Sequence, residues 1–501
     1  MYKILFSELI SLFPIIFFGM SLCFVLLFYS LISTQKLVHN SKTFTFNSVS
    51  FAYTIFITFF VMMVVFNSPS FFTIQFFGSV ACDSISSYSQ LFILFLALNC
   101  LVSYTINNRL SFFNYYEFFY IYLVSIFSIF ILVSSTDLIS VYLCLELQSI
   151  TIYILSASNK NSSFSIESSL KYLIIGAFSS GFFLFGSSLI YGFIGTTNYY
   201  FLQDLVNFNF QEYSIVYVGF TFVFLSIIFK LGVAPFHIWI PDIIEGVEMS
   251  LSIFIMTASK FSLLICLLRF VSTHYLSFYQ FIFLFFTVFS WAIGSLGLSY
   301  QKRVKRFLIF SSISHYGFVI LSISINTLCS FQFAFIYYMV YLVSSILIFM
   351  LVMCITKKNS NVIIFLDELE GLLRENYFFT FCFSIVIFSM AGIPPFSGFF
   401  IKYFIILSFV DMMSVFILWF FIVFSVINIF YYIKVIKLFI FSSSFSENYF
   451  PTCYFFSNAS TFVSVLVVFF ILLFVFPTSL PFLFNLGYYV SIHFFFLYFS
   501  I

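Results

Sequence analysis

Four charged side chains stand inside long apolar runs of the sequence. They are Glu146, in Leu145-Glu146-Leu147-Gln148, and the lysines Lys230, Lys260 and Lys402, each in a run of its own. A charge at the centre of a bilayer costs at least ~2.5–3.5 kcal/mol on insertion scales, so such a residue rarely faces lipid. We therefore expect the four side chains to converge on a hydrated interior.

Proton transfer is the chemistry that suits this set. Burial disfavours the charged form of a lysine and a nearby carboxylate favours it, so a lysine beside a glutamate is poised to gain and lose a proton. We predict that Glu146 pairs with Lys230, and that separating this pair sends a proton toward Lys260. The alternative is a set of fixed salt bridges that only hold helices together.

Three further residues are candidates for supporting this proton path. Lys171 follows Glu167 by four residues, a spacing that makes either a local surface pair or a feed into the interior. His237 and His315 have side chains that titrate near neutral pH and are candidate relays. A histidine inside a helix is also a common hydrogen-bonding core residue, and both alternatives stay open.

Two of the apolar runs carry the same interruption. Gly232 and Pro235 break the first, and Gly392, Pro394 and Pro395 break the second, each within Gly-x-x-Pro-Phe. Proline removes a helical hydrogen bond and clashes with the preceding turn, so both helices should break inside the membrane. Paired broken helices indicate an inverted repeat with its site near the midplane, whereas incidental proline kinks are the simpler alternative.

Composition fixes the class of protein. Of the 501 residues, 63% are hydrophobic and only 7% are charged, whereas a soluble domain has roughly 25% charged residues. The net charge of +2 excludes an ordinary nucleic-acid-binding protein. The nine cysteines form no C-x-x-C motif, and no phosphate-binding glycine loop is present, so the sequence predicts neither a metal site nor a cofactor in this chain.

The sequence predicts an all-α polytopic membrane protein, because a spanning helix needs ~20 apolar residues. About fourteen runs qualify: 9–32, 50–67, 89–105, 118–135, 138–157, 168–194, 214–241, 248–270, 278–298, 306–326, 331–355, 377–409, 412–441 and 460–477. A last apolar piece, 482–499, is either a further span or an interfacial helix. We expect N-terminal helices in 1–117, one repeat in 118–270, a second in 278–441, and a C-terminal part in 442–501.

Basic residues gather in the loops after odd-numbered spans, whereas the even loops offer Arg269 and several acids, among them Asp83 and Asp137. Positive charge marks the cytoplasmic or matrix side. The even loops and the N-terminus are therefore expected on the opposite, outer side.

Several strings resemble the antiporter-like subunits of proton-pumping NADH:ubiquinone oxidoreductase (respiratory complex I), and among these the chain 2 type. They include Leu145-Glu146-Leu147-Gln148-Ser149, Gly195-Thr196-Thr197-Asn198, the stretch from Phe229 to Trp239, and Ala391-Gly392-Ile393-Pro394-Pro395-Phe396. The likeness runs from about residue 90 to 440. One departure is that Gly246 leads into Val247-Glu248, where the family has a proline-containing stretch.

The resemblance implies fourteen core helices, two inverted five-helix bundles, and discontinuous seventh and twelfth helices. It also implies one proton channel, with Glu146 and Lys230 as the modulating pair, Lys260 as the central lysine and Lys402 as the terminal one. NADH, flavin, iron–sulfur clusters and ubiquinone would be bound by other subunits. The implied partners are membrane lipids and other membrane-arm subunits, including a chain 4 type antiporter-like neighbour.

We therefore predict a proton-translocating membrane-arm subunit of complex I. The 88 phenylalanines and the lack of a transit-peptide pattern favour the mitochondrial inner membrane over a bacterial plasma membrane. Two alternatives remain: a sodium/proton antiporter-type subunit of the same superfamily, and a membrane scaffold that does not pump.

Overall fold

The structure is a computed structural model of the chain. It describes residues 11–27, 43–66, 73–108, 116–159, 162–208, 214–274, 277–355, 363–370, 373, 377–394, 396–410 and 415–440. The chain divides into two compact units. Unit 1 comprises Met1–Leu231 and Gly246–His274, and unit 2 comprises Gly232–Glu245 and Tyr275–Ile501.

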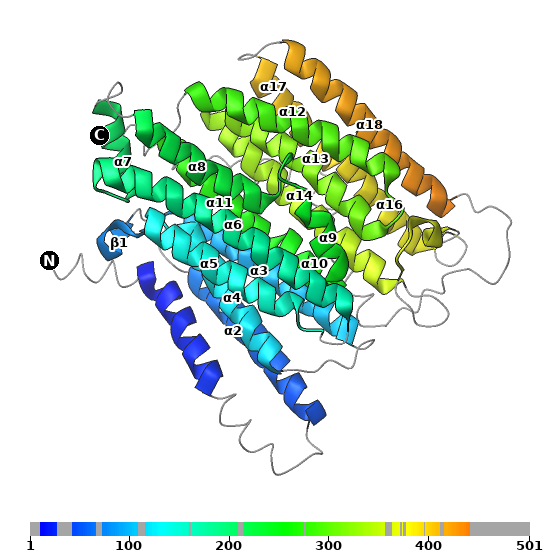
Figure 1. Cartoon of the computed structure of the whole chain (residues 1–501). Helices are drawn as coiled ribbons and strands as arrows, with labels where there is room; N and C mark the ends of the chain where they lie inside the picture. The colour runs from blue at the N-terminus through cyan, green and yellow to red at the C-terminus, as the bar shows by residue number, and fades with distance from the viewer. Residues whose placement is uncertain are drawn as a thin grey trace. The chain divides into compact units, whose positions relative to one another are not determined.

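Unit 1 is built from long apolar helices (Figure 1). Its first helix covers Ser11–Leu27. The others are α2 (Thr43–Phe66), α3 (Ser84–Asn108), α4 (Tyr116–Ser134), α5 (Leu138–Ser156), α6 (Ser163–Ile194), α7 (Tyr199–Phe208), α8 (Ser214–Leu231), α10 (Met249–Met256) and α11 (Ala258–His274). α10 and α11 form one nearly continuous span that is buried within the chain.

A small β-hairpin caps one end of unit 1. Strands β1 (Thr73–Gln75) and β2 (Val80–Cys82) pair antiparallel, joined by the single turn η1 (Phe76–Gly78). The main chain of Thr136, between α4 and α5, donates to the Ser79 oxygen at 2.9 Å and accepts from the Tyr199 amide at 3.0 Å. The hairpin, the α4–α5 connection and the start of α7 therefore form one hydrogen-bonded cap.

α6 and α8 run side by side and touch through their backbones (Figure 1). A Cβ added to Gly186 would lie 2.6 Å from the Gly219 oxygen, and one added to Gly219 would lie 2.9 Å from the Gly186 oxygen. Glycine at both positions is what permits this approach, as is common between membrane helices. The approach fixes the first third of α8 against α6.

Unit 2 has the same kind of framework. Its elements are α9 (Trp239–Gly246, except for its last residue), α12 (Ser277–Tyr300), α13 (Val304–Ile325), α14 (Leu328–Cys354), η2 (Leu366–Leu369), α16 (Tyr377–Ala391), α17 (Ser397–Val410) and α18 (Val415–Ile440). Thr327 and Ser330 form a capping box at the start of α14, which satisfies two otherwise free amide groups.

Ion pairs attach α9 to the start of α13. Arg306 Nε donates to Glu245 Oε2 at 2.5 Å, Arg306 Nη2 lies 3.3 Å from Asp242 Oδ1, and Arg303 also pairs with Glu245. Lys305 donates to the Ile244 oxygen at 3.3 Å. Two acids of the short helix that follows the first break thus pair with two of the cations at 302–306.

The helical membrane fold predicted from the sequence is confirmed, because every expected span from the first to the thirteenth contains an apolar helix. Both predicted breaks are also present. α8 ends at Leu231 before Gly232 (φ 73°), and α16 ends at Ala391 before Gly392 (φ 79°). Pro235 and Pro394 lie in the non-helical turns that follow. Pro395 and the segments 460–477 and 482–499 lie outside the described residues.

Four local features differ from the expectation. The hairpin and α7 occupy stretches predicted as loops, and the span 249–272 is interrupted at Thr257. Arg269 is a buried residue within α11 and not a loop cation. The sidedness and the predicted domain boundaries stay predictions, and most loop cations used for sidedness lie outside the described residues.

Candidate functional site

The structure brings Glu146 and Lys230 together inside unit 1. Glu146 lies near the middle of α5, and Lys230 lies in the last turn of α8. Their Oε1 and Nζ atoms are 3.9 Å apart, which is an ion pair without a direct hydrogen bond. Lys230 Nζ donates instead to the Leu145 oxygen at 3.4 Å. Glu146 Oε1 is buried and has no hydrogen-bond partner among the described residues.

The side chain of Lys260, a residue of α11, reaches the C-terminal end of α8. Its ammonium donates to the main-chain oxygens of Lys230 at 2.7 Å and of Leu231 at 2.6 Å. These carbonyls lack helical partners because α8 stops at Leu231, and they form the negative end of the helix dipole. The side chain is only 2% exposed. The break at Gly232 thus creates the site that holds this buried lysine.

The turn before Lys260 is irregular. Thr257 separates α10 from α11 with φ −111° and ψ −79°, and its hydroxyl donates to the Ile253 oxygen at 2.7 Å. Next to the lysine, the Ser259 oxygen accepts a hydrogen bond of 3.3 Å from Gln148 of α5. α5, α8 and α11 therefore meet around Lys260. No glycine or proline marks Thr257, so the sequence carried no signal for this interruption.

Unit 2 repeats the arrangement with Lys402 of α17. Lys402 Nζ donates to the oxygens of Met390 at 3.3 Å and Ala391 at 3.0 Å, the last carbonyls of α16 before the second break. It also lies 5.1 Å from the centre of the Phe318 ring, within the range of a cation–π contact. Each unit therefore places one buried lysine on the exposed carbonyls of a broken helix.

His315 is buried in α13 among tyrosines of unit 2. Its Nδ1 lies 2.6 Å from the Tyr337 hydroxyl and its Nε2 lies 3.2 Å from the Tyr432 hydroxyl. The Tyr341 ring stacks on the imidazole with 4.5 Å between centroids. Both ring nitrogens thus have polar partners, an arrangement compatible with a core histidine and with a proton relay.

The remaining candidates, His237 and Lys171, make local contacts. His237 follows the first break, belongs to unit 2, and its Nδ1 contacts the Pro235 oxygen of the same turn at 3.2 Å. Lys171 pairs with Glu167 at 2.8 Å on α6, and their side chains are 42% and 59% exposed. In unit 1 the structure therefore gathers Glu146, Lys230 and Lys260, whereas Lys171 makes the local pair.

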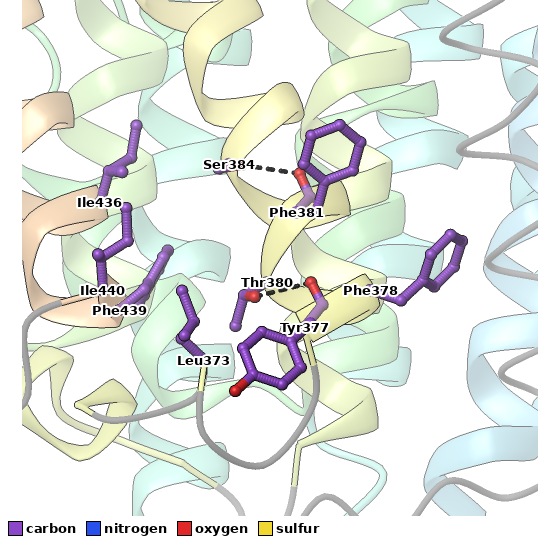
Figure 2. Close-up of a pocket in the computed structure, with 9 residues that line it drawn as sticks. All are labelled: Leu373, Tyr377, Phe378, Thr380, Phe381, Ser384, Ile436, Phe439 and Ile440. Carbon is purple, nitrogen blue, oxygen red and sulfur yellow. Dashed lines mark hydrogen bonds between the residues drawn. The ribbon is translucent and has the colours of Figure 1, made fainter.

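A pocket in unit 2 is not part of this charged set. It has a volume of about 480 Å³ and lies between α16 and α18, where apolar side chains such as Phe381, Ile436 and Phe439 line it (Figure 2). The hydroxyls of Thr380 and Ser384 donate to carbonyls of their own helix. The pocket has the lining expected of a membrane-facing groove and offers no charged group.

The chain is similar to known membrane proteins in sequence and in fold. A model of the family described as NADH:quinone oxidoreductase/Mrp antiporter, transmembrane, matches residues 135–428. NADH-ubiquinone oxidoreductase chain 2 of Marchantia polymorpha is 32% identical over 76% of this chain and 79% of its own length. NADH-quinone oxidoreductase subunit N 1 of Rhizobium meliloti is 29% identical over 72% and 76%.

Solved structures share the fold. A chain in respiratory complex I from Thermus thermophilus with bound aureothin has a TM-score of 0.74 at 22% identity, covering 91% of this chain and 97% of that one. A chain in the Mrp complex of Dietzia sp. has a TM-score of 0.76 at 16% identity, with 98% of both chains covered. The family match covers residues 135–428, including Glu146, Lys230, Lys260 and Lys402, and the chain therefore belongs to the NADH:quinone oxidoreductase/Mrp antiporter family of membrane subunits.

Proposed function

We propose that this chain moves protons across the membrane as a membrane-arm subunit of an NADH:quinone oxidoreductase, using Glu146, Lys230, Lys260 and Lys402. One observation carries the proposal. Three ionisable side chains from three different helices meet in unit 1, with Lys260 on the main-chain oxygen of Lys230 and Glu146 3.9 Å from the Lys230 amine.

The geometry gives each residue a task. Lys230 is held by Glu146 through charge alone, so its flexible side chain is free to leave the carboxylate. When the Lys230 ammonium turns toward Lys260, repulsion between two positive charges favours release of one proton. When it returns to Glu146, the attraction is restored and Lys260 takes up a proton again. Lys402 provides the corresponding buried amine in unit 2.

Redox energy enters through other subunits. The relatives are named as subunits of NADH-ubiquinone and NADH-quinone oxidoreductases. We place NADH, flavin, iron–sulfur clusters and ubiquinone in the partner chains of that enzyme. This chain contributes the membrane path, and we assign it to the mitochondrial inner membrane.

Partner subunits are also needed to cover part of unit 1. Glu146 is 26% exposed, and beside it on α5 Leu143 and Ile150 are 60% and 47% exposed. A carboxylate that opens toward lipid is costly at this depth. We propose that another membrane-arm subunit covers this face of α5, and that a chain 4 type antiporter-like subunit is among the neighbours of the chain.

The decisive experiment changes Lys230→Ala in the assembled complex and measures protons moved per NADH oxidised in sealed vesicles. The proposal expects normal assembly and a loss of translocation. Unchanged translocation by an assembled variant would contradict it, and a failure to assemble would support the scaffold alternative. Phe201→Ala is a suitable control, because this 59% exposed side chain on α7 lies outside the charged set.

A translocation assay in the same vesicles distinguishes a proton pump from a sodium/proton antiporter. The antiporter remains an alternative because of the family name and the fold shared with the Mrp complex. A pump builds its gradient without added sodium. Translocation that requires an opposing sodium gradient would favour the antiporter.

A further inference from the structure

A second buried charge pair lies in unit 1, away from the lysines. Asp83, at the start of α3, and Arg269, in α11, are joined by a 2.7 Å contact between Oδ1 and Nη2. Their side chains are 0% and 4% exposed. Arg269 is nine residues beyond Lys260 in the same helix, which corresponds to about 14 Å along the axis. The pair therefore lies toward the end of unit 1 that carries the hairpin cap.

The two carboxylate oxygens of Asp83 differ. Oδ1 accepts from Arg269 and, at 2.7 Å, from the amide of Ser86, so that it also caps α3. Oδ2 is buried and has no hydrogen-bond partner among the described residues. Buried polar atoms are normally paired, and an unpaired one has a high cost unless water or a proton occupies it. Asp83 thus keeps one oxygen available for a proton.

Arg269 is held in place independently of Asp83. Its Nε donates to the Val133 oxygen in the last turn of α4 at 3.0 Å. A buried ion pair contributes little net stability, because the cost of removing two charges from water offsets their attraction. A contribution to stability alone therefore does not explain why this ion pair is buried.

Other titratable groups face the pair from the cap. Cys82 of β2 precedes Asp83, and Tyr200 of α7 interacts electrostatically with both Arg269 and Asp83. Burial raises the pKa of Tyr200 to about 12, so its hydroxyl keeps its proton. A second acid in the cap, Asp137, also has a buried oxygen without a hydrogen-bond partner among the residues described. Two acids at the hairpin end of unit 1 therefore each have a carboxylate oxygen that no described residue hydrogen-bonds.

We propose that Asp83 is a further proton-carrying residue, which passes protons from the lysines to the outer side of the membrane, with Arg269 as its positioning residue. The inference rests on the proposed function, because the lysine path supplies the proton, and on the sidedness predicted from the loop charges. A lysine ammonium that gives up its proton loses one N–H bond, and the proton forms one O–H bond at Oδ2. This neutralises the carboxylate and weakens the ion pair. Breaking that bond delivers the proton to external water, and Arg269 then pairs with the carboxylate again.

The test is the assembled complex with the neutral pair Asp83→Asn and Arg269→Gln. The asparagine oxygen keeps the cap of α3, neither variant residue leaves a buried charge unpaired, and an amide does not carry the proton. We expect normal assembly and a loss of proton translocation to the level of Lys230→Ala. Translocation equal to that of the unmodified complex would overturn the inference.

Infrared difference spectroscopy during turnover detects protonation of carboxyl groups directly. An ion pair with a purely structural role would give no such signal. We expect a transient band of a protonated carboxyl group that shifts in Asp83→Glu, a variant that keeps both the charge and the proton-carrying group. Absence of any shift would overturn the inference even if the neutral pair failed to assemble. Lys230→Ala, measured in parallel, separates the two claims, because normal translocation by that variant would overturn the proposed function itself.

Discussion

The Lys260 ammonium donates a 2.7 Å hydrogen bond to the main-chain oxygen of Lys230, the residue whose side chain pairs with Glu146. Lys402 makes the equivalent contact with the main-chain oxygen of Met390 at 3.3 Å in unit 2. At both breaks a glycine with positive φ follows the last residue of a helix, and a lysine donates to the carbonyls that this ending leaves unpaired. The lysines thus stabilise the helix ends more strongly while they are protonated, which links their charge to the local backbone.

Replacing Lys260 by methionine should remove both the charge and the support of α8. Hydrogen bonds from a charged group contribute about 1.5–3 kcal/mol, so we expect a lower melting temperature of the purified complex together with a loss of translocation. Lys260→Arg keeps the donors and the charge but holds its proton far more tightly. This variant should retain the stability and still lose translocation. Equal translocation by Lys260→Arg and the unmodified complex would contradict a proton-carrying role.

Gly392→Ala tests the site of Lys402. A Cβ at this residue would lie 2.9 Å from Lys402 Nζ, and the φ of 79° adds strain. Gly195, with the same φ, has no atom within 4 Å of such a Cβ among the described residues. Both alanine variants should lose about 1–2 kcal/mol through left-handed backbone strain. Only Gly392→Ala should also reduce translocation in vesicles, and an equal reduction in Gly195→Ala would point to strain alone.

Gly186→Ala should disturb the contact between α6 and α8. Its Cβ would lie 2.6 Å from the Gly219 oxygen, a main-chain atom, and overpacking of this kind costs about 1–3 kcal/mol. Gly181, on the same helix, has open space at its Cβ position among the described residues. We expect less assembled complex on native gels for Gly186→Ala and none of this loss for Gly181→Ala. Similar yields for the two variants would show that the close approach is dispensable.

The reactivity of Cys82 reports the charges around Asp83. Burial, followed by the Asp83 charge, raises the pKa of this thiol to about 11, whereas Arg269 lowers it. Only the thiolate is alkylated, so at pH 8 about one molecule in a thousand should be reactive, and the rate should rise with pH. Asp83→Asn should speed alkylation of Cys82 at a given pH and Arg269→Gln should slow it, as measured by mass spectrometry. Acceleration in both variants would indicate a general opening of the cap instead.

Local signals made much of the fold predictable. Runs of apolar residues set the positions of the spans, and glycine followed by proline set both breaks, because these residues act on their own backbone. The meeting of Glu146 and Lys230 was also predictable, since isolated charges in apolar helices need partners. The sequence alone did not indicate that Lys260 would bind carbonyl groups.

The missed features depend on distant residues. Asp83 and Arg269 are separated by 186 positions, so no spacing rule connects them. The hairpin has strands of only three residues and depends on hydrogen bonds to the α4–α5 connection and to Asn198. Such short elements have no periodicity to detect, and the tertiary contacts that hold them are invisible in a single sequence.

The backbone contact between Gly186 and Gly219 has a mechanical consequence. It pins α8 at one point, and Lys230 lies eleven residues farther along the same rigid rod, about 16 Å away. A slight tilt of α8 about this contact moves the C-terminal end of the helix most. That end carries both the Lys230 amine and the carbonyls that bind Lys260. One small rotation of α8 would therefore lengthen the distance between Lys230 and Glu146 and move the Lys260 ammonium at the same time.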